Sequence, residues 1–320
     1  MKIVYKGDPE KIKILSQQGF NDFELYVRNS QDLELNFKNV IALHFHYKLD
    51  DGRTINLADE GEIGELSEVM LKKAIECAKR NGVKKVVFHP PTVNLFKVSK
   101  EKAIKTMVQR LENVHDPDVL LCIENTCLWI SQAHNNEPLF VEPEDYFKII
   151  NESKVPIGLT FDVEHFHVTA VMKLFYEQYR KDLLDVDLKK INYENVVKKF
   201  ESSLQGNFQE SCHQFVSQAL EKLKPYINHV HVCGSDFNKY FFNPQSTLPL
   251  IGEHLPIYFS GKSYGHDVKD RIDHNIWIEK LKDTDLDIVM EISPKDGYDF
   301  IDLLYKSRIH LENLKLLQLH

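Results

Sequence analysis

Short apolar segments alternate with helical patterns along all 320 residues, and this alternation restricts the fold more than any other feature. Eight segments have the length and the β-branched, apolar character of strands: Lys2–Tyr5, Asp22–Val27, Asn39–Tyr47, Lys84–His89, Val119–Glu124, Pro156–Asp162, Ile227–Cys233 and Asp287–Ile292. Helical spacing lies between them and is clearest in Glu62–Arg80, Glu101–Leu111 and Ile272–Leu281. Gly19 and Gly82 each precede a predicted strand, where a left-handed residue commonly ends a helix. The repeated strand–helix unit predicts an α/β fold, a (β/α)8 TIM barrel that spans residues 1–320 as a single domain.

Two connections are longer than a minimal barrel needs. A helical insertion at about residues 169–225 follows the sixth strand and contains the amphipathic stretch Cys212–Leu223. A loop at about residues 234–271, rich in aromatic residues, glycine and proline, follows the seventh strand. Because both follow a strand, we expect both at the C-terminal face, where barrel enzymes hold their active sites. Such loops commonly act as lids, substrate walls or subunit contacts, and the oligomeric state stays open.

The composition excludes several classes of protein. With 42% hydrophobic and 28% charged residues the chain can form a core, so disordered and fibrous classes are excluded. A net charge of −8 argues against a generic binder of polyanions. No apolar run reaches the roughly 18 residues of a membrane span, and the first residues lack the apolar core of a secretory signal. The five cysteines form no CxxC pair, which indicates reduced thiols and predicts a cytoplasmic chain.

Imidazoles and carboxylates gather where the predicted strands end. Six of the eight strands end in this way, with His44 and His46, His89, Glu124, Asp162 with the nearby His165, His229 and His231, and Glu291. Strands of a barrel converge at one rim, so these side chains are expected to share one space. Residues two apart on a strand share a face at different depths, so one histidine of each pair is expected to be a ligand and the other to lie deeper. The sequence does not choose between His44 and His46, or between His229 and His231.

This mixture of residues predicts a metal centre. Carboxylates that cluster in a dry pocket repel one another and need protons or cations to compensate them. Neutral imidazoles among them favour a transition metal such as zinc or manganese, and Glu124 could bridge two ions. Taken singly, a buried histidine is more often a hydrogen-bonded core residue than a ligand. Glu24, on the second strand, is interpreted as a structural ion-pair partner in preference to an acid at the rim.

The pattern resembles the xylose-isomerase-like barrel superfamily, which includes endonuclease IV and the sugar isomerases and epimerases, over nearly the whole chain. The superfamily carries Glu, Asp, His and Glu on successive strands, and this quartet maps onto Glu124, Asp162, His231 and Glu291. The quartet alone implies one divalent metal.

The endonuclease IV branch resembles the chain more closely. His44 is followed by Tyr47 and an Ile-Asn-Leu run at 55–57, and His89 ends a Val-Val-Phe-His-Pro motif. Further matches are Glu124-Asn125-Thr126, the Asp-x-x-His of Asp162 and His165, and a late loop histidine, His254. In that family such residues bind three zinc ions that cleave DNA beside a lost base. The resemblance therefore implies two or three divalent ions, with zinc expected and manganese or cobalt as alternatives, and these ligands: His44, His89, Glu124, Asp162, His165, His231, His254 and Glu291.

Some residues depart from the family pattern. The family places an Asp two residues before the late histidine, whereas this chain has Gly252, so a third metal would need the adjacent Glu253. Glu164 takes the place of a cysteine, and the stretch CLWISQ after Asn125-Thr126 replaces a run of small residues. These departures indicate a divergent relative.

Two functions fit these residues. The first is a metal-dependent phosphoester hydrolase that acts on abasic-site DNA or on a smaller phosphodiester. Four loop cations are candidates for phosphate contacts, with a solvated loop face as the equal alternative: Lys239, Lys262, Lys269 and Arg271. The alternative is a sugar or sugar-phosphate isomerase or epimerase with one metal, in which Glu124 and Glu291 serve as catalytic acid and base. The His44 and His89 motifs favour the hydrolase, and Gly252 with the negative net charge favours the isomerase. A metal-holding barrel without activity is a third interpretation, but a buried carboxylate cluster without a task would cost stability.

Overall fold

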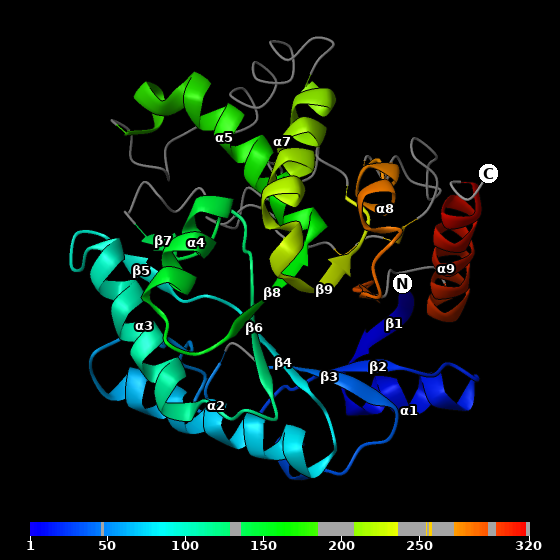
Figure 1. Ribbon diagram of the computed structural model, residues 1–320, viewed down its shortest axis with the longest axis horizontal. Coiled ribbons are helices and arrows are strands. Elements are labelled where there is room, and N and C mark those ends of the chain that lie inside the picture. Colours follow the sequence, from blue (N-terminus) through cyan, green and yellow to red (C-terminus); the bar gives the residue numbers. More distant parts are fainter. Residues whose placement is uncertain are drawn as a thin grey trace.

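The computed structural model describes residues 1–45, 48–128, 136–184, 208–235, 254, 256–257, 272–293 and 299–317. Eight parallel strands close into a barrel with helices around it (Figure 1). The strands, in their order around the barrel, are β1 (Lys2–Gly7), β2 (Phe23–Tyr26), β3 (Val40–His44), β4 (Lys85–Phe88), β6 (Leu120–Glu124), β8 (Ile157–Asp162), β9 (Ile227–Val232) and β10 (Asp287–Met290). All eight predicted strands are present, and the predicted (β/α)8 fold is confirmed.

The helices bury one face against the strands. They are α1 (Pro9–Gln17), α2 (Glu62–Arg80), α3 (Lys100–Val114), α4 (Pro143–Glu152), α5 (Val163–Leu184), α7 (Phe208–Leu223), α8 (Asn275–Leu281) and α9 (Phe300–Leu317), with 3-10 turns η1 (Asp32–Glu34) and η4 (Lys224–Tyr226). Side-chain oxygens of Asp8 and Ser99 accept the backbone N–H groups that begin α1 and α3. Gly19 and Gly82 have φ of 84° and 70°, which confirms the left-handed helix ends expected there.

A small antiparallel sheet was not foreseen from the sequence. It pairs β5 (Thr92–Asn94) with β7 (Asn136–Pro138), which follow β4 and β6 and so lie beyond the C-terminal ends of the barrel strands. Three-residue strands are too short to show the alternation by which strands are recognised.

The long connections are described only in part. Helix α5 begins directly after β8, and α7 covers the amphipathic stretch predicted within the helical insertion. These two helices pack on each other and extend beyond the strands at the top of Figure 1. Residues 185–207 of the insertion and most of the loop at 234–271 lie outside the described residues, and with them the four loop cations, Gly252 and Glu253.

Two further observations concern the class of protein. Within the described residues no helix combines the length and the apolar character that crossing a membrane would require. All five cysteines are buried and free, as the sequence predicted.

Candidate metal centre

The strand ends bring the predicted side chains together. His44, Glu124 and Asp162 are the last residues of β3, β6 and β8, and His231 stands next to the last residue of β9. His89 and Glu291 directly follow β4 and β10. In the sheet register Asp162 lies opposite His231, so these two ligand candidates occupy one layer of the barrel.

Two groups of donor atoms share one carboxylate. In the first, which we call the histidine group, Nε2 of His44 and Nε2 of His89 lie 3.7 and 3.6 Å from Oε2 of Glu124. The second, the carboxylate group, consists of Glu124, Asp162, His231 and Glu291. There, Nδ1 of His231 lies 3.3 Å from Oε1 of Glu124 and 3.2 Å from Oε2 of Glu291. Within each group all donor atoms lie within 4.8 Å of one another, so each could surround one metal ion.

The atoms that face these groups are buried and have no hydrogen-bond partner. They are Nε2 of His44, both oxygens of Glu124, Oδ2 of Asp162, Nδ1 of His231 and Oε2 of Glu291. Leaving one such atom unpaired costs about 1–3 kcal/mol, and native proteins rarely tolerate several in one place. A cation within each group would satisfy these lone pairs, so the residues present fit divalent metal ions.

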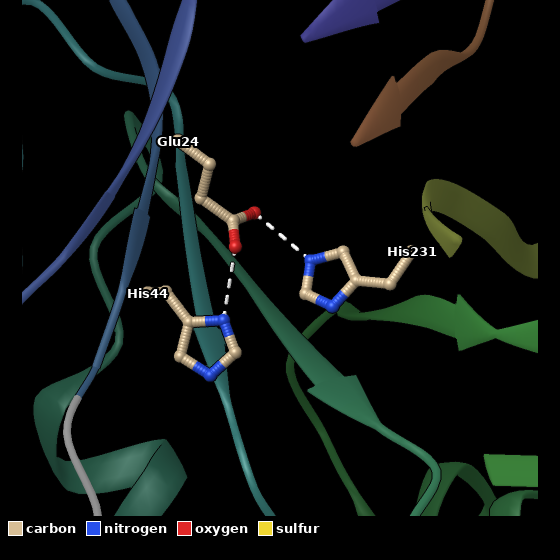
Figure 2. A group of neighbouring side chains, drawn as sticks. All are labelled: Glu24, His44 and His231. Carbon is tan, nitrogen blue, oxygen red and sulfur yellow. Dashed lines mark hydrogen bonds and ion pairs between the residues drawn. The ribbon is translucent and has the colours of Figure 1, made fainter. Parts of the chain in front are cut away.

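Glu24 links the two groups through their histidines. Its Oε1 accepts a hydrogen bond from Nδ1 of His44, and its Oε2 accepts one from Nε2 of His231, each at 3.0 Å (Figure 2). Because an ionised carboxylate can only accept, both ring nitrogens must carry the proton. The opposite ring nitrogens, Nε2 of His44 and Nδ1 of His231, therefore offer their lone pairs to the metal groups.

Glu24 also settles the depth of the histidine pair on β9. Nε2 of His229 lies 2.6 Å from Oε2 of Glu24, so His229 contacts Glu24. Nδ1 of His231 instead lies beside Glu124 and Glu291 in the carboxylate group. Glu24 is completely buried, and its contacts agree with the interpretation as an ion-pair partner. His46, the other candidate beside His44, lies outside the described residues.

Burial and the neighbouring imidazoles shift the pKa values of the buried carboxylates in opposite directions. Burial would raise the pKa of Glu24 and of Glu124, but the neighbouring imidazoles, His231 foremost, hold the pKa of both well below the usual range. Burial raises the pKa of Asp162 to about 7, and Glu124 adds repulsion. Burial lowers the pKa of His44, which keeps its ring neutral and suited to a metal ion.

Sequence reasoning did not single out Lys6. This residue of β1 is almost completely buried, with its Nζ 2.7 Å from Oε1 of Glu291 and 3.8 Å from Oε1 of Glu24. Burial would lower the pKa of Lys6, but Glu291, Glu24 and Glu124 raise it above its ordinary value. In the sequence Lys6 directly follows the predicted strand Lys2–Tyr5, and a lysine at the end of a strand more often faces solvent.

Asn125 fixes the two carboxylate-bearing strand ends relative to each other. Its Oδ1 accepts the backbone N–H of Asp162 at 2.7 Å, and its Nδ2 donates to the Asp162 carbonyl at 2.9 Å. Oδ1 of Asp162 in turn accepts the backbone N–H of His165 at 2.7 Å and so caps α5. One oxygen of Asp162 is thus used structurally, and the other is left for the carboxylate group.

The last two predicted ligands lie near different carboxylates of the centre, His165 near Glu124 and His254 near Glu291. Nδ1 of His165 is 2.7 Å from the Asn125 carbonyl, and Nε2 of His254 is 3.5 Å from Oε1 of Glu291. Among the described residues, His165 and His254 share no donor group, and His254 instead joins Glu164 and Cys233. A third ion held by His165 and His254 stays a prediction.

A cavity of about 240 Å³ opens beside the histidine group. Its polar lining consists of His89, His165 and three threonines: Thr54, Thr92 and Thr126. Most of the remaining lining is apolar and includes Phe45, Ile55, Leu57, Phe88 and Pro91. The cavity offers room for a compact, weakly polar group next to the candidate metal ligands.

Replacing Glu24 with glutamine is expected to weaken metal binding about 10–100-fold, the usual cost of losing a carboxylate that orients metal-bound histidines. Glutamine keeps one acceptor oxygen, so it cannot fix both His44 and His231, and its NH2 group opposes a ring N–H. Competition with a fluorescent chelator measures the affinity. The exposed Glu65 gives a matched control, Glu65→Gln, and equal affinities of the two variants would contradict the orienting role.

Comparisons with known proteins agree with this fold. The chain matches a family model described as the xylose isomerase-like TIM barrel over residues 12–299. No curated protein sequence matches it. Similar solved structures include a D-tagatose 3-epimerase-like protein, with 17% identity and a TM-score of 0.60, covering 99% of this chain and 98% of the other.

Two further structures show the range of proteins with this fold. Endonuclease IV from Thermus thermophilus is 15% identical with a TM-score of 0.53, covering 98% of this chain and 100% of its own. The IOLI protein with a bound zinc atom is 15% identical with a TM-score of 0.55, covering 98% of both chains. At such identities these structures bear on the fold alone. The matched family model, which extends over most of the barrel, establishes that the chain belongs to the xylose isomerase-like TIM barrel family.

Proposed function

We propose that this protein is a metal-dependent hydrolase of phosphodiesters, similar in type to endonuclease IV. The observation that carries the proposal is the shared carboxylate: Oε2 of Glu124 faces His44 and His89, while Oε1 faces His231. A carboxylate between two sets of ligands is typical of sites that hold two ions about 3.5–4 Å apart. An isomerase with a single metal would need the carboxylate group only and would leave Nε2 of His44 without a task.

The proposed ligands divide between two ions, for which zinc is the expected element. His44, His89 and Glu124 would hold one ion, and Glu124, Asp162, His231 and Glu291 the other. When bound, such ions supply Lewis-acid catalysis, since they draw negative charge from a phosphoester and acidify water. Imidazole nitrogens and carboxylate oxygens are the ligands that zinc sites of hydrolytic enzymes combine.

The chain's own residues supply positioning. Glu24 holds the ring planes of His44 and His231, and Asn125 holds the ends of β6 and β8 in register. Lys6 pairs with Glu291 and limits the repulsion among the carboxylates. Such rigid support keeps ligand positions fixed while charge develops on a reacting phosphate.

The substrate we propose is a phosphodiester with a compact organic group beside its phosphate. The apolar cavity next to His89 and His165 supports this choice, because its proline and phenylalanine side chains favour a sugar or ring over a second charged group. An abasic site in DNA and a smaller phosphodiester both have such a group.

Replacing His89 with alanine is expected to lower the bound metal by about one ion per chain, because the histidine group loses one of three ligands. Hydrolysis of bis(p-nitrophenyl) phosphate and of an abasic duplex should fall with it. Mass spectrometry of protein purified without chelator or affinity tag gives the stoichiometry. His115, at the end of α3 and away from both groups, provides the control variant His115→Ala. Unchanged metal content in His89→Ala would remove the histidine group from the proposal.

A sugar or sugar-phosphate isomerase or epimerase is the second candidate. It is favoured by the carboxylate group, which places Glu124 and Glu291 on either side of Nδ1 of His231 as a possible base and acid. The fold likeness to a D-tagatose 3-epimerase-like protein is compatible with it. Unchanged metal content in His89→Ala, together with turnover of a ketose, would select this candidate over the hydrolase.

A further inference from the structure

We propose that Glu164, Cys233 and His254 form a separate metal site that binds zinc through a cysteine thiolate. The site shares His254 with the pair expected for a third ion, His165 and His254, but has Glu164 and Cys233 in place of His165. The proposal does not depend on whether the neighbouring centre hydrolyses a phosphodiester or isomerises a sugar. We refer to these three residues as the thiol group.

Three different elements bring the thiol group together. Glu164 lies in the first turn of α5, Cys233 directly follows β9, and His254 comes from the connection between β9 and α8. One carboxylate oxygen, the sulfur and one ring nitrogen lie within 4.8 Å of one another. Glu164 and Cys233 are completely buried, and the side chain of His254 is 22% exposed. Carboxylate, thiolate and imidazole are the three kinds of protein ligand that zinc accepts, and a partly exposed edge leaves room for a fourth.

One ring nitrogen of the thiol group, Nδ1 of His254, has no hydrogen-bond partner. Sγ of Cys233 donates to Oε2 of Glu164 at 3.3 Å, and Oγ of Ser235 donates to Oε1 at 3.4 Å. Nδ1 of His254 is buried and has no hydrogen-bond partner. An imidazole nitrogen buried in this way costs free energy unless a further partner binds it, and a cation beside Glu164 and Cys233 would supply that partner.

The backbone of His254 is held in an uncommon conformation. Its φ is 43°, in the left-handed region that residues with a side chain rarely occupy. The His254 carbonyl accepts the backbone N–H of Ser293 at 2.9 Å, which ties it to the end of β10. Local strain of this kind persists where the surroundings fix a residue for a task.

The sulfur sets this site apart from the neighbouring centre. The histidine and carboxylate groups offer nitrogen and oxygen only, which suit zinc, manganese and cobalt alike. A thiolate selects softer ions, so the thiol group should retain zinc, cobalt or cadmium and reject manganese and magnesium. Binding replaces the S–H proton of Cys233, which passes to solvent, by a sulfur–metal bond.

Cobalt substitution of the full chain tests the site without reference to activity. Wild-type protein loaded with Co²⁺ is expected to show a near-ultraviolet thiolate-to-cobalt charge-transfer band. Cys233→Ser should lose this band together with about one equivalent of cobalt, since a hydroxyl is a poor substitute for a thiolate. Cys127→Ser is the matched control, because Cys127 is equally buried but outside the thiol group, and it should keep the band.

Two results would overturn the proposal. One is the absence of a charge-transfer band in cobalt-saturated wild-type protein, a result that needs no variant to fold. The other is a band that survives in Cys233→Ser. If Cys233→Ser does not fold, Glu164→Gln takes its place and should lower cobalt binding by about one equivalent. The two proposals are tested by different variants. The metal content of His89→Ala tests the histidine group, and the cobalt band of Cys233→Ser tests the thiol group, so one proposal can fail while the other holds.

Discussion

Replacing Glu124 with glutamine is expected to remove metal from both groups at once and to lower phosphodiester turnover by at least about 10³-fold, the scale of losing a central electrostatic contact. The reason is geometric: Oε2 faces the two imidazoles of the histidine group, and Oε1 faces His231 in the carboxylate group. Glutamine keeps one oxygen and presents an NH2 group, a donor, to the other side. Metal content by mass spectrometry and turnover of a chromogenic phosphodiester measure the two effects.

The comparison with His89→Ala makes this experiment decisive. A change in the histidine group alone should cost about one ion, whereas a change in the shared residue should cost about two. Glu152→Gln, an exposed change in α4, controls for the altered charge. If Glu124→Gln lost only one ion, Glu124 would not bridge the groups, and the single-metal isomerase would become the better account of the site.

The barrel could be predicted from the sequence because of how its strands are buried. Parallel strands covered on both sides read as nearly continuous apolar runs. All six residues of β8 are buried, for example, and that segment was foreseen to within one residue. The strands β5 and β7 gave no such signal, since each has only three residues and their pairing depends on where the loops after β4 and β6 meet.

The ligand candidates at the strand ends could also be predicted from the sequence, but the contacts by which Glu24 supports two of the histidines could not. Convergence of strand ends is a property of every barrel, so His44, Glu124 and Asp162 could be grouped without coordinates. The link between Glu24 and His231 spans 207 residues and depends on how far each side chain reaches across the barrel interior. The register between β2 and β3 also shifts beside Glu24, and such an irregularity leaves no mark in the spacing of residues.

Glu164 and Cys233 show a further limit of sequence reasoning. Glu164 directly precedes His165, and Cys233 lies two residues after His231, yet neither belongs to the set of ligand candidates that marked the strand ends. Their contact depends on α5 beginning without a loop after β8, which directs Glu164 toward the end of β9. The contact between Glu164 and Cys233 therefore follows from where α5 begins in the folded structure, which the sequence pattern does not predict.

Replacing Glu291 with glutamine is expected to lower turnover by about 10³-fold or more while the barrel stays folded. Its Oε2 lies 3.2 Å from Nδ1 of His231 in the carboxylate group, so the charge that it loses is one that would face the proposed ion. Its Oε1 binds Lys6 at 2.7 Å, and removing one partner of a buried ion pair costs about 3–5 kcal/mol. Glu24, 3.8 Å from the same ammonium, lessens that cost. Circular dichroism checks the fold, and retained turnover would remove Glu291 from the site.

The metal content of Glu291→Gln separates the two proposed functions. In the hydrolase, Glu291 is a ligand, so the variant should hold about one ion fewer than the wild type. In the isomerase, the carboxylate group would hold the only ion of the two groups, so Glu291→Gln should lose the same single ion as Glu124→Gln. The pH profile of turnover should also lose one limb. The double change Lys6→Met with Glu291→Gln isolates the ion pair, because it removes both charges. We expect the double variant to regain thermal stability but not turnover, since Lys6 supports the fold whereas Glu291 serves the reaction.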